Sequence, residues 1–346
     1  MKKKILMKGN EAAAEAAIIA GCRYYFGYPI TPQNEIPEYM SKRLPEVDGT
    51  FIQAESETAA INMVFGASSA GARAMTSSSS PGISLKQEGI SYLAAAQLPC
   101  VVINVSRGGP GLGNIAGSQG DYFQSTRGGG HGDYRTIVLA PFNCQEFADL
   151  TLKAFDLADE YRMVVMILTD GFVGQMSEPV ILPEPSGKKF DKPWAVGQGK
   201  RNKVASLILS PEDGLTQHNY SLEKVYNRVT EEVIDFEEYK LDDADYMIVA
   251  YGTSARIAKE AIEVLRTKGI KVGYFRPITL WPFPYKELKK ASEGKKKILT
   301  VEMSLGQMVE DVKLAVNGAI DVDFYGVPGG MLPTPEAIIE KVVSYE

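Results

Sequence analysis

The chain has 346 residues, which on ordinary domain sizes corresponds to about two domains. Hydrophobic residues make up 45% and charged residues 23%, as in typical globular proteins, and no run of about 18 uncharged apolar residues is present to cross a bilayer. The formal net charge is −6, and no block of about five basic residues occurs. We therefore expect neither a membrane span nor nucleic acid as the main partner. The apolar start is interrupted at Lys8, so we expect no secretory signal and a cytoplasmic location.

Cysteines and histidines are too few and too scattered for a metal centre held by this chain. Cys22, Cys100 and Cys144 are far apart, without a C-x-x-C spacing, which argues against a zinc site or an iron–sulfur cluster on this chain alone. His131 and His218 are the two histidines, too few for a multi-histidine metal centre and unpromising for a conventional triad. Any redox metal is expected on another subunit.

Over the first 180 residues, apolar runs of strand type alternate with helical patterns, which is typical of a parallel sheet covered by helices on both faces. The predicted helices are 10–20, 33–44, 57–70, 84–96 and 145–160. The predicted strands are 22–27, 50–54, 72–76, 100–105, 136–140 and 163–169. The segment 106–135 is rich in glycine, and a loop of this length inside a compact domain is usually functional or mobile.

Residues 178–245 change in character and predict a connector that ends in a charged amphipathic helix. The alternation then resumes. The predicted strands are 246–251, 271–275, 298–302 and 321–325, and the predicted helices are 254–268, 285–292, 306–316 and 334–344. We therefore expect a doubly wound α/β domain over residues 1–180, a connector over 181–244 and a smaller α/β domain over 245–346.

Four loops that follow predicted strands are candidates for chemistry, because ligands gather at the carboxyl ends of strands in open parallel sheets. In Gly27–Pro32, the sequence GYPITP, two prolines fix the backbone around the Thr31 hydroxyl; the alternative is a rigid turn with Thr31 as a helix N-cap. The loop QAESETAA places Glu55 and Glu57 at the start of a helix. Either one of them acts as an acid toward a ligand nitrogen, or Ser56 caps the helix and Glu57 complements its dipole.

The other two loops carry hydroxyl groups and an arginine. TSSSSPG, residues 76–82, offers donors to a polar ligand or is a capped turn, and it lacks the G-x-S-x-G spacing of a serine hydrolase. Arg107 directly follows a buried strand, where it can clamp a substrate carboxylate or form an ion pair with Asp121 or Asp133.

A further glycine-rich run, residues 128–133, is flexible enough for a lid. Within it, His131 either donates to a ligand or lies at the surface. Dinucleotide-binding and P-loop motifs are absent after the strands, so those nucleotide-binding functions are weak candidates.

The motifs GYPITP, QAESETAA, MTSSSSPGISL, NVSRGGPGLGN and LTDGFVGQMSEPV, in this order, resemble the α subunit of the thiamine diphosphate-dependent 2-oxoacid:ferredoxin oxidoreductases. The sequences of these motifs are most similar to those of the branched-chain, 2-oxoisovalerate type. The resemblance continues through YGTSARIAKEAIEVLR, RPITLWPFP and EMSLGQMVEDV and covers nearly the whole chain. It implies a pyrimidine-type thiamine diphosphate-binding domain followed by a domain like the C-terminal domain of transketolase.

The resemblance also implies roles for individual residues. In the family, the glutamate of an S-E element contacts N1′ of the cofactor's aminopyrimidine, which makes Glu57 the implied catalytic residue, with Glu55 second. An acid at that position favours the imino form of the ring, from which the nucleophilic carbon arises. Thr31 and Arg107 match the family's substrate-contacting residues. The implied cofactor-binding residues are Glu57, Tyr28, Pro29 and Ser80.

The implied reaction is oxidative decarboxylation of a 2-oxoacid to acyl-CoA and carbon dioxide, with reduction of ferredoxin. The chain lacks the G-D-G motif with following asparagines that binds Mg²⁺ and diphosphate, and Asp170 in TDG is no substitute. Expected partners are therefore a β subunit that binds Mg²⁺ and the diphosphate, a γ subunit and a ferredoxin-like δ subunit. Iron–sulfur clusters and coenzyme A are expected on or with these partners.

The identity of the 2-oxoacid is constrained by one departure from the family. Related 2-oxoglutarate enzymes tend to have T-S-G-P-G where this chain has S-S-S-P-G at residues 78–82, which favours a branched-chain substrate. Pyruvate, 2-oxoglutarate and aromatic 2-oxoacids stay open, because a pocket distinguishes a methyl from a methylene by only about 1–3 kcal/mol. An E1-type or transketolase-like component and a non-catalytic α/β binding protein are the remaining alternatives.

Overall fold

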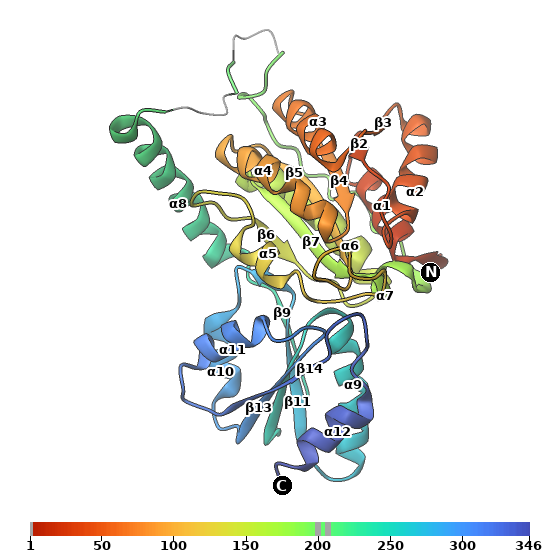
Figure 1. The fold of residues 1–346 in the computed structure, drawn as a ribbon, viewed down its shortest axis with the longest axis vertical. Coiled ribbons are helices and arrows are strands. Elements are labelled where there is room, and N and C mark those ends of the chain that lie inside the picture. The colour runs from red at the N-terminus through yellow and green to blue at the C-terminus, as the bar shows by residue number, and fades with distance from the viewer. Residues whose placement is uncertain (1–2, 198–201, 205–208) are drawn as a thin grey trace.

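The computed structural model describes residues 3–197, 202–204 and 209–346. Its chain builds two main sheets and a separate two-stranded one. The main sheets lie one above the other in Figure 1, with the N-terminal half of the sequence in the upper one and the C-terminal third in the lower one. The larger sheet has the strand order β12-β6-β7-β5-β4-β2-β3. Its strands pair in parallel except for β12, which is antiparallel to β6. The strands are β2 (Tyr24–Gly27), β3 (Thr50–Gln53), β4 (Ala74–Ser78), β5 (Cys100–Ser106), β6 (Ile137–Leu139), β7 (Val164–Asp170) and β12 (Thr279–Trp281).

Helices cover both faces of this sheet, because its central strands are apolar on both sides. In β5, Val102 contributes to the core under α3 and α4, whereas the neighbouring Ile103 contributes to the core under α1, α2 and α6. The helices are α1 (Gly9–Ile19), α2 (Glu35–Arg43), α3 (Glu57–Ser69), α4 (Pro81–Ala95) and α6 (Cys144–Tyr161), with a 3₁₀ turn at Leu44–Val47.

The smaller sheet has the order β14-β13-β10-β11-β9 and is parallel except for β9, which is antiparallel to β11. Its strands are β9 (Phe236–Tyr239), β10 (Tyr246–Val249), β11 (Val272–Pro277), β13 (Lys297–Glu302) and β14 (Val322–Gly326). One face is covered by α9 (Gly252–Thr267) and α12 (Pro335–Val343), and the other by α10 (Tyr285–Ser292) and α11 (Met308–Val316).

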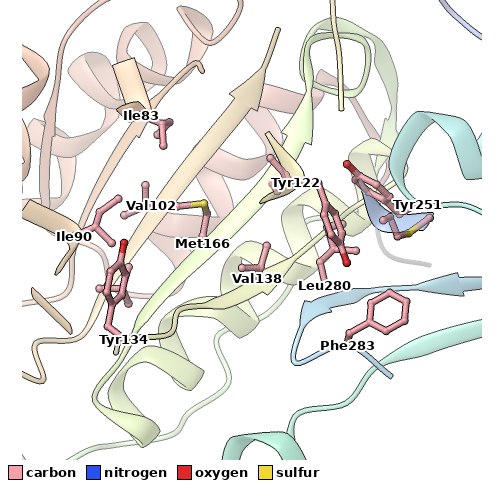
Figure 2. Packing of buried hydrophobic residues seen from close by; sticks show 14 of the residues in the cluster. Ile83, Ile90, Val102, Tyr122, Tyr134, Val138, Met166, Tyr251, Leu280 and Phe283 are labelled. Carbon is pink, nitrogen blue, oxygen red and sulfur yellow. The ribbon is translucent and has the colours of Figure 1, made fainter. Parts of the chain in front are cut away.

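A continuous apolar core joins the two sheets. Figure 2 shows Tyr122 beside Tyr251, whose ring centroids are 5.8 Å apart, with Leu280 and Phe283 nearby. Tyr122 begins the short helix α5 (Tyr122–Arg127) inside the glycine-rich segment, and Tyr251 precedes α9 of the other sheet. The segment after β5 is therefore built into the contact between the two halves of the chain.

Short elements complete the fold. β1 (Ile5–Lys8) pairs antiparallel with β8 (Ser177–Val180), and α7 (Gly171–Gln175) precedes β8. A π-helical turn at Pro211–Leu215 leads into α8 (Thr216–Glu232). No helix in the described part of the chain combines the length and apolarity needed to span a membrane.

The predicted α/β class is confirmed. Three differences matter for the site. The segment 106–135 contains α5 and packs against the second sheet. The expected connector 181–244 contains α8 and also β9, an edge strand of the smaller sheet. β12 lies in the C-terminal part of the chain but extends the larger sheet. Residues 198–201 and 205–208 of the connector lie outside the described residues.

Candidate active site

Four adjacent strands, β5, β4, β2 and β3, end at the same edge of the larger sheet because they run parallel. The loops that leave them at this edge are the four candidate loops of the sequence. Thr31 follows β2, Glu57 follows β3, Ser80 follows β4 and Arg107 follows β5. The residues implied for substrate and cofactor binding therefore approach one another from four strands.

The loop after β2 rests on a buried polar network. The Tyr25 hydroxyl and Ser77 Oγ are 2.7 Å apart, and Ser77 Oγ donates to Gln33 Oε1. Gln33 Nε2 in turn donates to the Tyr28 carbonyl at 3.3 Å. This network fixes the loop from below, while the Tyr28 side chain remains 37% exposed. Pro29 is exposed as well.

Thr31 does not cap a helix, so that alternative is wrong. α2 begins at Glu35, and Asn34 is its N-cap residue. Thr31 Oγ1 accepts a hydrogen bond from Asn34 Nδ2 at 3.4 Å, which leaves the hydroxyl proton available to a ligand. The Thr31 side chain is half-buried.

Glu57 is the first residue of α3, and its side chain is buried, with 6% exposed. Ser56 caps this helix, since Ser56 Oγ accepts from the Ala59 amide at 3.1 Å. The capping role of Ser56 is therefore compatible with a separate role for the Glu57 side chain. Glu55, the second candidate, is exposed.

Gly82 gives the Glu57 carboxyl group its space. A Cβ atom at position 82 would lie 2.7 Å from Glu57 Oε1 and 2.1 Å from Ser78 Oγ, both far below van der Waals contact. The Glu57 carboxyl group thus faces the turn between β4 and α4.

Ser80 holds this turn in an unusual backbone conformation. Its φ is +26° and its ψ is −83°, in a region that L-residues rarely adopt. The Ser80 hydroxyl donates to Asp121 Oδ2 at 2.6 Å and accepts from the Arg107 amide at 2.9 Å. Asn104 links the same groups, because it accepts from the Ser80 amide at 3.1 Å and donates to Asp121 Oδ2 at 2.8 Å. The Ser80 side chain therefore positions protein groups.

Arg107 is a buried cation without a carboxylate partner among the described residues. Its side chain donates from Nη1 to the Thr31 carbonyl at 2.9 Å and from Nη2 to the Leu112 carbonyl at 3.2 Å. The residue is 8% exposed, and its Nε has no hydrogen-bond partner. The expected alternative, an ion pair with Asp121 or Asp133, is wrong. A desolvated guanidinium that lacks a counter-charge attracts an anion, and its planar fork suits a carboxylate.

Two hydroxyl groups at this edge, Ser78 Oγ and Ser79 Oγ, are buried without a partner within the described structure, as is Thr76 Oγ1 inside β4. Buried polar atoms are nearly always hydrogen-bonded, because an unmet donor costs about 1–3 kcal/mol. Together with Arg107 Nε and the space beside Gly82, they fit a polar ligand seated against α4.

The described residues show no grouping of three or more His, Cys, Asp or Glu side chains suited to a metal ion. Asp170 caps α7, accepting from the Phe172 amide at 2.9 Å, and also accepts from Thr253 Oγ1 at 2.9 Å. These bonds occupy its Oδ1 atom with structural partners.

Gln119 was not found by sequence reasoning, although it ties the glycine-rich segment to the second half of the chain. Its amide nitrogen donates to the Tyr251 carbonyl at 2.8 Å, and its amide oxygen accepts from Ser254 Oγ at 2.8 Å and from the Met303 amide at 2.9 Å. No motif in the sequence marks this glutamine.

His131 lies apart from these residues. It is exposed, its ring meets Tyr92 edge-on at 6.4 Å, and it lines a cavity of about 320 Å³ together with His218 between α4 and α8. The structure places no contact between His131 and the residues at the strand ends.

Two family models match the chain. The model described as pyruvate flavodoxin/ferredoxin oxidoreductase, thiamine diphosphate-binding, matches residues 15–247. The model described as pyruvate:ferredoxin oxidoreductase core domain II matches residues 244–338.

Individual proteins are similar over nearly the full chain. Ketoisovalerate oxidoreductase subunit VorB of Methanothermobacter thermautotrophicus is 50% identical, over 97% of this chain and 96% of its own length. 2-Oxoglutarate synthase subunit KorA of Methanocaldococcus jannaschii is 39% identical, over 97% of this chain and 98% of its own length. A solved structure, 2-oxoglutarate:ferredoxin oxidoreductase from Magnetococcus marinus with 2-oxoglutarate, coenzyme A and succinyl-CoA bound, has a TM-score of 0.89 at 28% identity. The match covers 99% of this chain but 65% of that chain.

Proposed function

The chain belongs to the 2-oxoacid:ferredoxin oxidoreductases as one of their subunits, and from this premise we propose that its substrate is 2-oxoisovalerate. The complex would convert this 2-oxoacid to the acyl-CoA and carbon dioxide and pass the electrons to ferredoxin. The identity to a ketoisovalerate oxidoreductase subunit, 50%, exceeds the 39% to a 2-oxoglutarate synthase subunit and supports this substrate.

Arg107 is the observation that carries the proposal. A buried guanidinium with a free Nε and no carboxylate partner in the described structure stands at the strand edge, in contact with Thr31. We assign Arg107 to the substrate carboxylate, with the Thr31 hydroxyl as a second donor. Because an arginine that binds the carboxylate equally well before and during decarboxylation would not speed the reaction, Arg107 contributes mainly to substrate affinity.

The group that fits the strand edge is thiamine diphosphate, which supplies a carbon nucleophile for the 2-oxoacid carbonyl and accepts the electron pair that carbon dioxide leaves behind. Glu57 is proposed to hold a proton at N1′ of its aminopyrimidine ring. Burial of Glu57 and the unmet hydroxyl groups of Ser78 and Ser79 support that assignment. Tyr28 and Pro29 would contact the cofactor from the loop after β2. Ser80 would contribute to the cofactor site by holding the turn between β4 and α4 in place.

Three partner subunits are proposed for this chain. A β subunit would bind Mg²⁺ and the diphosphate, a ferredoxin-like δ subunit would carry iron–sulfur clusters, and a γ subunit would complete the assembly with coenzyme A.

Two domains are proposed within the chain. Residues 1–180 would form the pyrimidine-type domain and residues 245–346 the transketolase C-terminal-like domain, with residues 181–244 joining them. The two family models meet near residue 245, which supports the second of these boundaries. We expect the complex in the cytoplasm.

The decisive experiment is a kinetic panel on the assembled complex, with a viologen dye as electron acceptor. 2-Oxoisovalerate is expected to give the highest kcat/KM among branched-chain 2-oxoacids, pyruvate, 2-oxoglutarate and an aromatic 2-oxoacid. A preference of tenfold or more for pyruvate or 2-oxoglutarate would overturn the substrate assignment. Exchange of the cofactor C2 proton in Glu57→Gln tests the second assignment, which predicts that the rate falls by orders of magnitude.

A further inference from the structure

Lys86 is a fully buried lysine that the proposed mechanism leaves without a role. It lies on α4, one turn after Gly82, and its side chain shows 0% exposure. Its Nζ donates a hydrogen bond to the backbone carbonyl of Glu57 at 3.3 Å. No carboxylate lies within ion-pair distance of Lys86 among the residues that the structure describes. Burying an ammonium group costs free energy, so its contact with the Glu57 backbone calls for an explanation.

The Glu57 carboxyl group is the charge that acts on Lys86. Burial lowers the pKa of Lys86 to about 8, and the negative charge of Glu57 opposes that shift. At the N-terminal end of α4, Asp121 is bonded to Ser80. Further titratable groups lie toward the C-terminal half of α4: Glu88 and Tyr92 on the helix itself, and His131, Asp133, Tyr134 and His218 around the cavity beside it. Glu57 is therefore the acidic residue whose charge influences Lys86, at a separation beyond ion-pair distance, while the Glu57 backbone carbonyl holds the ammonium.

We propose that Lys86 is a positioning residue for Glu57: its buried ammonium anchors the first turn of α3 and stabilises the ionised form of the Glu57 carboxyl group. The inference rests on the proposed function, in which Glu57 shares a proton with N1′ of the aminopyrimidine. When Glu57 gives that proton to N1′, it is left as a carboxylate. A neighbouring cation lowers the free energy of this ionised state and so favours the transfer.

The charge on Lys86 also sets the pH range of the effect. Lys86 carries its proton below about pH 8, so it supports ionised Glu57 there, and its influence fades as the pH rises through that value. A purely structural anchor would instead affect the binding of thiamine diphosphate and of an analogue without N1′ alike.

The test compares wild type, Lys86→Met, Lys86→Arg and Glu57→Gln in the assembled complex between pH 6 and 9. One readout is the dissociation constant of thiamine diphosphate, measured beside that of an analogue in which N1′ is replaced by carbon. The other is the rate of C2 proton exchange. Lys86→Met is expected to lose about tenfold of the preference for thiamine diphosphate over the analogue at pH 6.5, because the neighbouring cation that favours the carboxylate is gone. C2 exchange is expected to slow to a similar extent, and both differences from wild type should shrink above pH 8. Lys86→Arg, which keeps a cation, should recover most of the loss.

Each result has a distinct meaning. If Lys86→Met matches wild type at every pH while Glu57→Gln abolishes exchange, the role of Lys86 is overturned and the proposed function stands. If Glu57→Gln leaves exchange and the preference for thiamine diphosphate unchanged, the proposed function of Glu57 fails, and the inference fails with it. If Lys86→Met and Lys86→Arg both lower thiamine diphosphate and analogue binding equally at all pH values, Lys86 is structural and the inference is likewise overturned.

Discussion

The Arg107 guanidinium donates a hydrogen bond to the Thr31 backbone carbonyl at 2.9 Å, joining two loops whose residues are 76 positions apart in the sequence. Together with the bond from Nη2 to the Leu112 carbonyl, this contact fixes the direction of the guanidinium, because the planar group then keeps its remaining donors in a set plane. The two residues assigned to the substrate carboxylate are therefore positioned by each other before any substrate is present.

Replacing Arg107 tests whether it acts on substrate affinity. Arg107→Met is expected to raise KM for the 2-oxoacid about 10–100-fold, because a hydrogen bond to a charged group contributes about 1.5–3 kcal/mol. kcat should fall much less. Arg107→Lys keeps the charge but loses the bidentate fork, so its KM should lie between those of wild type and Arg107→Met. Steady-state kinetics of the assembled complex measures both constants, and a large loss in kcat with unchanged KM would contradict the assignment.

Ser80 lends itself to a matched pair of substitutions, because its φ of +26° favours glycine. Ser80→Ala removes the bonds to Asp121 and Arg107 and keeps the strained backbone, so the free energy of unfolding should fall by about 1–3 kcal/mol. Ser80→Gly loses the same bonds but relieves the strain, and it should be the more stable of the two by about 1 kcal/mol. Urea unfolding followed by tryptophan fluorescence gives the difference. Equal stability of the two variants would show that position 80 is not strained.

The common edge of the four candidate loops could be expected from the sequence by a simple rule. Apolar runs identify parallel strands, and residues that follow such strands share one edge of the sheet. Thr31, Glu57, Ser80 and Arg107 each follow a different strand, so their proximity could be expected from strand order alone. The sequence could not predict that Glu57 is buried and Glu55 exposed, because both residues suit a helix N-terminus.

Contacts between distant parts of the chain could not be predicted from local sequence patterns. Gln119 is one of many polar residues in a glycine-rich loop, and its role depends on Tyr251 and Met303, more than 130 residues away. β12 joins the larger sheet from the C-terminal part of the chain through a strand of three residues, too short for a periodicity to show. Such features depend on tertiary packing, which local propensity does not encode.

The buried amine of Lys86 predicts a pH dependence of stability. Its pKa is about 8 in the folded chain and near 10.5 when unfolded, so the unfolded state binds more protons between these values. The contribution of Lys86 to the free energy of unfolding therefore rises as the pH increases from about 8 to 10.5, by on the order of 3 kcal/mol in total. Lys86→Met should lack this rise. Urea unfolding of both proteins at several pH values isolates it, because contributions from other groups cancel in the difference; parallel curves would contradict the burial of a charged amine.

Gly82 and Gly66 form a matched pair for testing the space around Glu57. A methyl group at position 82 would overlap Ser78 Oγ and Glu57 Oε1, whereas a Cβ at Gly66, on the same helix as Glu57, meets nothing within 4 Å. Gly82→Ala should therefore displace the Glu57 carboxyl group and weaken thiamine diphosphate binding to the assembled complex by tenfold or more, with a smaller effect on an analogue that lacks N1′. Gly66→Ala should bind the cofactor normally and be more stable by up to about 1 kcal/mol, because alanine replaces glycine inside a helix. Isothermal titration of both variants measures the binding. If Gly82→Ala binds thiamine diphosphate as tightly as Gly66→Ala does, the Glu57 carboxyl group does not touch the ring from the place the structure gives it.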